Sequence, residues 1–135
     1  MAACLYQVKV ARMAVAMAAE PAIKQYALML IVEYSAIHTE LMVLAQAREV
    51  PPSELMPADK KAALDGLAKA GTDFDRQFLQ TVTAHDLPEN IRLFESASRE
   101  SKDSELRAWI AKIVPYLREH LAVIRALPIV TSAVR

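Results

Sequence analysis

The sequence predicts an all-helical protein, and three features of the chain support this prediction. The composition is 54% hydrophobic with only two glycines and seven prolines in 135 residues, which leaves little room for hairpin turns. Apolar residues recur in steps of three and four, the spacing of one buried helix face. The residue types that start at Glu20 also match those that start at Asp103, which indicates a weak internal repeat of one helical unit.

The clearest helix is predicted at residues 103–127, DSELRAWIAKIVPYLREHLAVIRAL. Asp103 is its expected N-cap, and Pro128 marks its end. Pro115 lies inside the segment and should bend the helix. His120 is the one polar residue on the apolar stripe. The apolar members of that stripe are Leu106, Ile110, Ile113, Leu117, Ile124 and Leu127.

Two further helices are predicted in the first third of the chain. Residues 2–18 are rich in Ala, Val and Met, and two sides of this helix are apolar. The second helix begins at Pro21, because a proline at the first helical position loses no hydrogen bond, and Glu20 is its weak N-cap. It ends near Arg48, before two prolines. Its seam consists of Ile23, Ala27, Leu30, Tyr34, Ile37, Leu41 and Leu44.

The connection that follows is long for neighbouring antiparallel helices and is interpreted as a crossover. It should contain a short helix from Pro57 to about Gly71. The next helix is expected to start at Thr72, with Asp75 completing a capping box, and to kink or break at Pro88. Its expected seam is Phe74, Phe78, Val82 and His85.

Two helical hairpins joined by a long crossover make a four-helix bundle of ferritin-like connectivity. A chain of 135 residues fits a single domain, residues 1–135, with a core large enough to need no disulfide. The only cysteine is Cys4, so no internal disulfide forms. Sixteen basic and sixteen acidic residues cancel, and no charge excess favours nucleic acid or an anionic membrane.

No run of about 18 uncharged apolar residues is present, so no transmembrane segment is expected. The uncharged apolar run from Ala27 to Val32 is only a quarter to a third of that length. Lys9 and Arg12 interrupt the apolar stretch at the amino terminus, where a signal peptide would have its hydrophobic core. The residues themselves therefore do not distinguish a cytoplasmic protein from an exported one whose signal has been removed.

Three strings carry a family resemblance over nearly the whole chain. They are EPAIKQYALMLIVEYSAIHTELMVLA at residues 20–45, FDRQFL at residues 74–79 together with His85, and the string at residues 103–127. These strings resemble the bacterial domain of unknown function family 4142, which is assigned to the ferritin-like superfamily. The resemblance implies export to the periplasm or cell surface, and it implies no established activity.

The chain departs from the family pattern in the second helix and in the first. Glu33 and Tyr34 stand where members have Asp-His, and His38 stands where members have Asn. Gln7 and Lys9 occupy positions where members usually have glutamates. These departures affect any site that relies on the family's histidine or carboxylates in these helices.

The residues suggest one metal or small-ligand site and count strongly against another. A ferritin-like di-iron site needs Glu-x-x-His pairs, and no glutamate here is followed three residues later by histidine. A mononuclear site for zinc, copper or iron, in contrast, would use His85 and His120, with Tyr34, Glu33 or His38 nearby. The alternative is that each histidine is a core residue bonded to a hydroxyl or a backbone carbonyl. No catalytic residue is assigned, and no cofactor is expected apart from such a metal.

Two functions follow as expectations. The first is a non-enzymatic structural or interaction protein of the bacterial cell envelope, forming a homo-oligomer or binding an envelope protein through its apolar helix faces. The second is a metal- or ligand-binding protein centred on His85 and His120. Neither involves nucleic acid.

Overall fold

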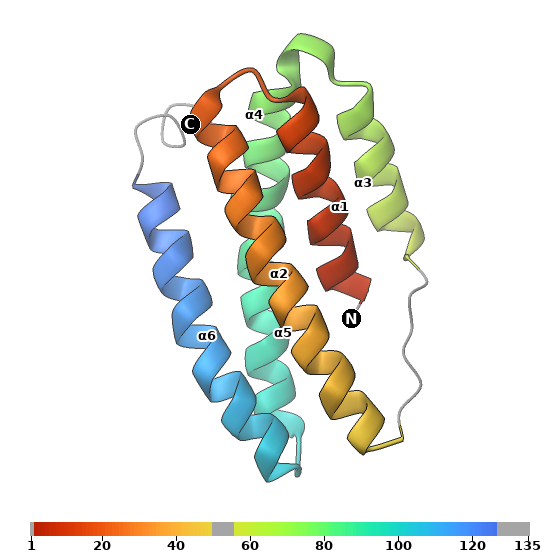
Figure 1. Ribbon diagram of the computed structural model, residues 1–135, viewed down its shortest axis with the longest axis vertical. Helices are drawn as coiled ribbons and strands as arrows, with labels where there is room; N and C mark the ends of the chain where they lie inside the picture. Colours follow the sequence, from red (N-terminus) through yellow and green to blue (C-terminus); the bar gives the residue numbers. More distant parts are fainter. Residues whose placement is uncertain (1, 50–55, 127–135) are drawn as a thin grey trace. The chain divides into compact units, whose positions relative to one another are not determined.

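The computed structural model describes residues 2–49 and 56–126, and the regular elements in these ranges are all helical (Figure 1). The chain forms two compact units, Met1–Phe78 and Leu79–Arg135. The prediction of an all-helical protein is therefore confirmed. The single domain and the ferritin-like arrangement stay predictions.

In the first unit, α1 (Ala2–Met17) and α2 (Pro21–Ala47) form an antiparallel hairpin (Figure 1). Both helices begin and end close to the predicted residues. Glu20 has the extended backbone of an N-cap, with φ −81° and ψ 125°, but its side chain makes no capping hydrogen bond. Pro21 occupies the first turn as expected.

The carboxylate of Asp75 bonds the backbone at the start of α2 instead. It accepts the N–H of Ala19 at 3.0 Å and the N–H of Glu20 at 2.9 Å. The predicted capping box between Thr72 and Asp75 is wrong, because the helical backbone already begins before Thr72 as a 3₁₀ turn that has no side-chain cap. Asp75 thus satisfies donors that lie outside the hydrogen-bond ladder of α2.

The predicted seam of α2 is buried from Ile23 to Ile37 and only half-buried at Leu41 and Leu44. Aromatic rings extend this core: the centroid of Phe78 lies 6.1 Å from that of Tyr26, with the rings edge to face. The side chains of α1 that complete the core of the unit are Tyr6, Val8, Val10, Ala11 and Ala14.

The predicted short helix is confirmed as α3 (Ala58–Ala68). The 3₁₀ turn η1 (Gly71–Asp73) follows, and then α4 (Phe74–Phe78). Gly71 has a φ of +59°, a conformation that glycine adopts without steric cost. The Lys60 ammonium lies 4.7 Å from the centroid of the Tyr6 ring, a cation–π contact between α3 and α1.

The second unit contains the π-helix η2 (Leu79–Asp86), α5 (Leu87–Glu100) and α6 (Ser104–Arg125). Pro88 does not break the helical backbone; it occupies the first turn of α5, and the irregularity is the π-helix before it. The centroids of Phe94 on α5 and Trp109 on α6 are 5.8 Å apart.

Helix α6 confirms the predicted start, because Asp103 accepts the N–H groups of Glu105 at 3.0 Å and Leu106 at 3.2 Å. The buried side of the helix is centred slightly away from the predicted stripe, since Ile113 and His120 are only half-buried. The predicted stop at Leu127 and Pro128 lies outside the described residues. The buried side chains of α6 are Ile110, Val114, Leu117, Leu121 and Ile124.

By length and composition alone, α2 meets the criteria for a helix that crosses a bilayer. Its most apolar 18-residue window has a mean hydropathy of 1.5, and 28% of that window is buried. The core helix of a globular protein has a similar composition, so this criterion is weak evidence. Glu33 interrupts this window, so it contains no uncharged apolar run of about 18 residues.

Candidate functional site

His85 lies in the π-helix beside a buried carboxylate. Its Nδ1 atom is 3.0 Å from Oδ1 of Asp86, and the two side chains are 73% and 3% exposed. The prediction that His85 belongs to the core seam is therefore wrong. The hydrogen bonds of a π-helix span five residues, so the buried positions after Val82 shift to Thr83 and Asp86.

The pair has a defined chemical geometry. When Nδ1 of His85 carries the proton, it donates to Asp86, and Nε2 is then an acceptor on an exposed ring. A carboxylate that orients an imidazole in this way is also found behind metal-binding and proton-transferring histidines. Sequence reasoning missed Asp86 as a buried residue because an aspartate at the flank of a predicted apolar seam is normally exposed to solvent.

His120 contacts an aromatic neighbour one turn away on α6. The centroids of the His120 and Tyr116 rings are 4.2 Å apart, with an angle of 46° between the ring planes. His120 is half-buried, while Tyr116 is 46% exposed. His120 therefore lies at the edge of the buried side of α6, and not at its centre.

The other two predicted ligands, Tyr34 and His38, lie one turn apart on α2 in the first unit. Tyr34 is 1% exposed. The Nδ1 atom of His38 is buried and makes no hydrogen bond within the described part of the chain. Since His85 and His120 belong to the second unit, the four-residue metal set stays a prediction.

In residues 2–49 and 56–126, no three His, Cys, Asp or Glu side chains are grouped in a way that could hold a metal ion. The thiol of Cys4 is 3% exposed, and burial raises its pKa to about 11. This thiol is therefore protonated at neutral pH and is a poor nucleophile.

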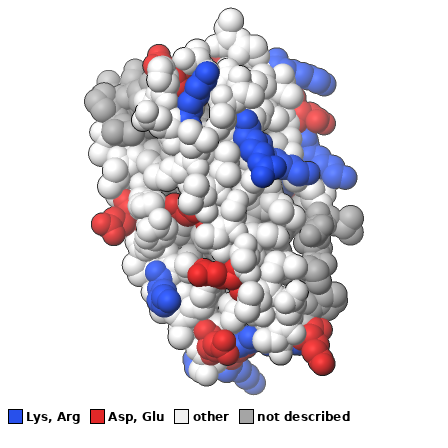
Figure 2. Space-filling view, in the orientation of Figure 1, with Lys and Arg blue, Asp and Glu red and all other residues white. Residues whose placement is uncertain are grey.

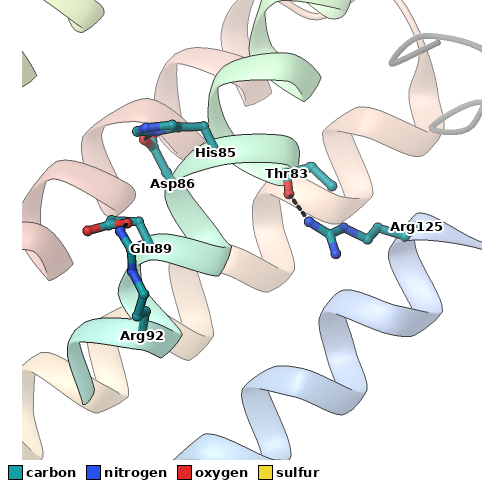
Figure 3. A network of polar contacts seen from close by, with 6 residues as sticks. All are labelled: Thr83, His85, Asp86, Glu89, Arg92 and Arg125. Carbon is teal, nitrogen blue, oxygen red and sulfur yellow. Dashed lines mark hydrogen bonds and ion pairs between the residues drawn. The ribbon is translucent and has the colours of Figure 1, made fainter. Parts of the chain in front are cut away.

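Several polar contacts lie along the π-helix and the first turns of α5 in the second unit (Figure 3). Nη2 of Arg125 donates to the backbone carbonyl of Thr83 at 3.4 Å, which links α6 to the π-helix. Arg92 bonds Glu89 one turn away on α5. The sequence pattern did not predict this network, because Arg125 and Thr83 are 42 residues apart. Pro88 was the available signal, since a proline removes one helical N–H donor.

The first unit exposes an apolar surface along α2, which we call the α2 face. Leu28, Val32 and Val43 define it, and their exposed fractions are 52%, 72% and 62%. They lie on one side of the helix because their spacings of four and eleven residues are close to whole turns. Glu33 is the one charged residue in residues 25–39, and it is 8% exposed. Figure 2 shows wide uncharged areas between the charged side chains in this view.

Comparison with known proteins identifies a family. The model of the family described as domain of unknown function (DUF4142) matches residues 1–127. No curated protein and no solved structure matches the chain.

Proposed function

The chain belongs to the DUF4142 family, and on that premise we propose that it is a non-enzymatic helical interaction protein of the bacterial cell envelope. The observation that carries this proposal is the α2 face. A helix this apolar is normally covered by its own protein, yet only 28% of its most apolar window is buried. The exposed part is therefore suited to contact with a second protein surface.

The partner we propose is a second copy of the chain. The α2 face has no exposed charge between Gln25 and Ser35, so two copies can approach through it without electrostatic repulsion. A twofold dimer places the same helix face on both sides of the contact, which allows Leu28 and Val32 to pack on each other's equivalents. Because the chain has a net charge of zero, two copies do not repel each other over long distances.

The oligomeric state tests this proposal. We expect light scattering coupled to size exclusion to show a concentration-dependent dimer of the wild-type chain and a monomer of Val32→Glu. Val123→Glu is the matched control, because Val123 is 61% exposed on α6 and lies in the other unit. The control should leave the dimer intact. A wild-type monomer at all concentrations, or equal effects of the two variants, would contradict the proposal.

The envelope location rests on the family resemblance and has its own test. Cells that express the complete gene would be fractionated by osmotic shock, with a periplasmic and a cytoplasmic marker enzyme followed in parallel. We expect the protein to follow the periplasmic marker. Release together with the cytoplasmic marker would overturn the envelope assignment and leave the dimer proposal standing.

The ferritin-like arrangement belongs to the same proposal. Each unit contains one helical hairpin, α1 with α2 and α5 with α6, as a ferritin-like bundle of two hairpins requires. Spin labels on exposed Ala16 and Ala108 would report whether the two hairpins pack into one bundle. A single narrow distribution of the distance between the two labels would support one bundle. A broad distribution would contradict it.

A further inference from the structure

A surface hollow of about 340 Å³ lies between α5 and α6. We call it the α5/α6 hollow. Ile91 and Leu121 form its floor and are 6% and 7% exposed, while Pro88 and Ala122 complete the apolar lining. Its volume falls at the lower end of the range of small-ligand sites, which are mostly apolar with a few polar groups. Ala122 has a small side chain, so a larger residue at this position would fill part of the hollow.

Arginines form the rim of this hollow. Arg92, Arg118 and Arg125 line it, against the single carboxylate of Glu95. Counting the nearby Glu89 as well, the group keeps a net charge of +1, from three arginines minus two glutamates. The edge of the hollow is therefore positive while its floor is apolar.

The ion pairs on the rim hold these guanidinium groups without using all their donors. Arg118 bonds Glu95 across the two helices through Nη2, and Arg92 bonds Glu89 through Nη2. A guanidinium has five N–H donors, so each of these two groups retains donors for a further acceptor. The pairs also reduce the side-chain freedom that binding would otherwise remove.

Arg125 also contacts the backbone of the π-helix. Its Nη2 atom donates to the carbonyl of Thr83 at 3.4 Å, a contact that helps to orient the guanidinium beside the hollow (Figure 3). Arg118 and Arg125 lie seven residues apart, or two turns of α6, and so project on the same side of the helix.

From this geometry we propose that the α5/α6 hollow binds a small organic anion, a carboxylate or phosphate monoester that carries a short apolar group. The anionic head bonds the arginine rim, and the apolar group covers Ile91 and Leu121. An inorganic anion leaves the floor uncovered, and a neutral alcohol leaves the guanidinium groups without a charged acceptor. This site is independent of the α2 face.

Octanoate and octyl phosphate are suitable probes, used with the full chain below the concentration at which they form micelles. Methyl resonances of Ile91 and Leu121 would be followed by NMR during titration. We expect saturable shifts centred on these two residues. Octanol and inorganic phosphate should each bind at least about tenfold more weakly. Octanol lacks the anionic group that bonds the arginine rim, and inorganic phosphate lacks the apolar group that covers the floor.

Two variants test the rim and the floor separately. Arg118→Gln should weaken octanoate binding about tenfold, whereas Arg107→Gln, an exposed arginine on α6 outside the hollow, should leave it unchanged. Ala122→Leu should block the hollow without removing charge, and Ala108→Leu is its matched control. Circular dichroism would verify that each variant folds.

Three outcomes would overturn the proposal. The first is equal binding of octanoate and octanol. The second is octanoate binding that neither Arg118→Gln nor Ala122→Leu changes. The third is binding to phosphatidylglycerol vesicles without binding to free octanoate or octyl phosphate, because that result would indicate a membrane surface as the ligand.

Discussion

Arg125 on α6 donates a hydrogen bond of 3.4 Å to the backbone carbonyl of Thr83, five residues before Pro88. If the π-helical pattern of η2 continued past Asp86, the N–H of residue 88 would bond that carbonyl, but proline has no N–H. The guanidinium of Arg125 therefore donates to a carbonyl for which Pro88 offers no N–H. A side chain far along the chain completes the local hydrogen bonding at the end of η2.

This relationship predicts a coupling between Arg125 and Pro88. Arg125→Ala should lower the free energy of unfolding by roughly 0.5–1 kcal/mol, the contribution of one such hydrogen bond. In a Pro88→Ala background the same change should cost less, because residue 88 then supplies its own N–H. Urea unfolding of the four proteins gives the coupling free energy. Arg107→Ala is the control, and equal costs in both backgrounds would contradict the prediction.

A second prediction concerns Asp75 and the turn between α1 and α2. Asp75→Ala removes the acceptor of the Ala19 and Glu20 N–H groups and should destabilise the protein by about 1–2 kcal/mol, as loss of an N-cap does. Asp65→Ala removes an exposed carboxylate on α3 and should change stability little. Thermal unfolding followed by circular dichroism compares the two variants. Equal melting temperatures would show that the bonds to Asp75 contribute nothing.

The buried thiol of Cys4 predicts a pH dependence. Burial raises its pKa from 9.0 to about 11, so the unfolded chain loses this proton at a lower pH than the folded chain. The associated stability is fully present below pH 9 and is lost as the pH rises from about 9 to 11. Cys4→Ala should remove this part of the decline, which is measured as the difference between the two urea-unfolding curves across that pH window.

The burial of Cys4 also predicts a slow rate of thiol alkylation. At pH 8 a pKa raised by about two units leaves roughly 100-fold less thiolate, so alkylation by iodoacetamide should be at least that much slower in the native protein than in urea. Equal rates in the two solvents would show that Cys4 is exposed in solution.

Metal content distinguishes the proposed interaction protein from the alternative centred on His85 and His120. Elemental analysis of untagged protein, before and after incubation with zinc, copper and iron, should find no near-stoichiometric metal. His85→Ala and His120→Ala should therefore leave the result unchanged. Metal that is retained by the wild type and lost in either variant would establish a metalloprotein. Tyr34→Phe and His38→Ala would then identify the remaining ligands.

Much of the helical architecture follows from local chemistry that is visible in the sequence. Asp103 accepts the N–H groups of the first turn of α6 as predicted, and Pro21 begins α2 where its missing donor has no cost. The candidate site was less predictable. His85 was assigned to the core on a 3.6-residue period, but the π-helix changes that period over residues 79–86 and turns its ring to solvent.

The sequence by itself determined the helical class, the approximate helix bounds and the apolar character of α2, because caps, prolines and apolar periodicity act within one or two turns. Only the tertiary structure decided that Asp75 bonds Ala19 across 56 residues and that Arg125 reaches Thr83 across 42. It also decided that Leu28 and Val32 face outward although they are apolar. The physical reason is that these outcomes depend on which segments pack together, and no single segment contains that information.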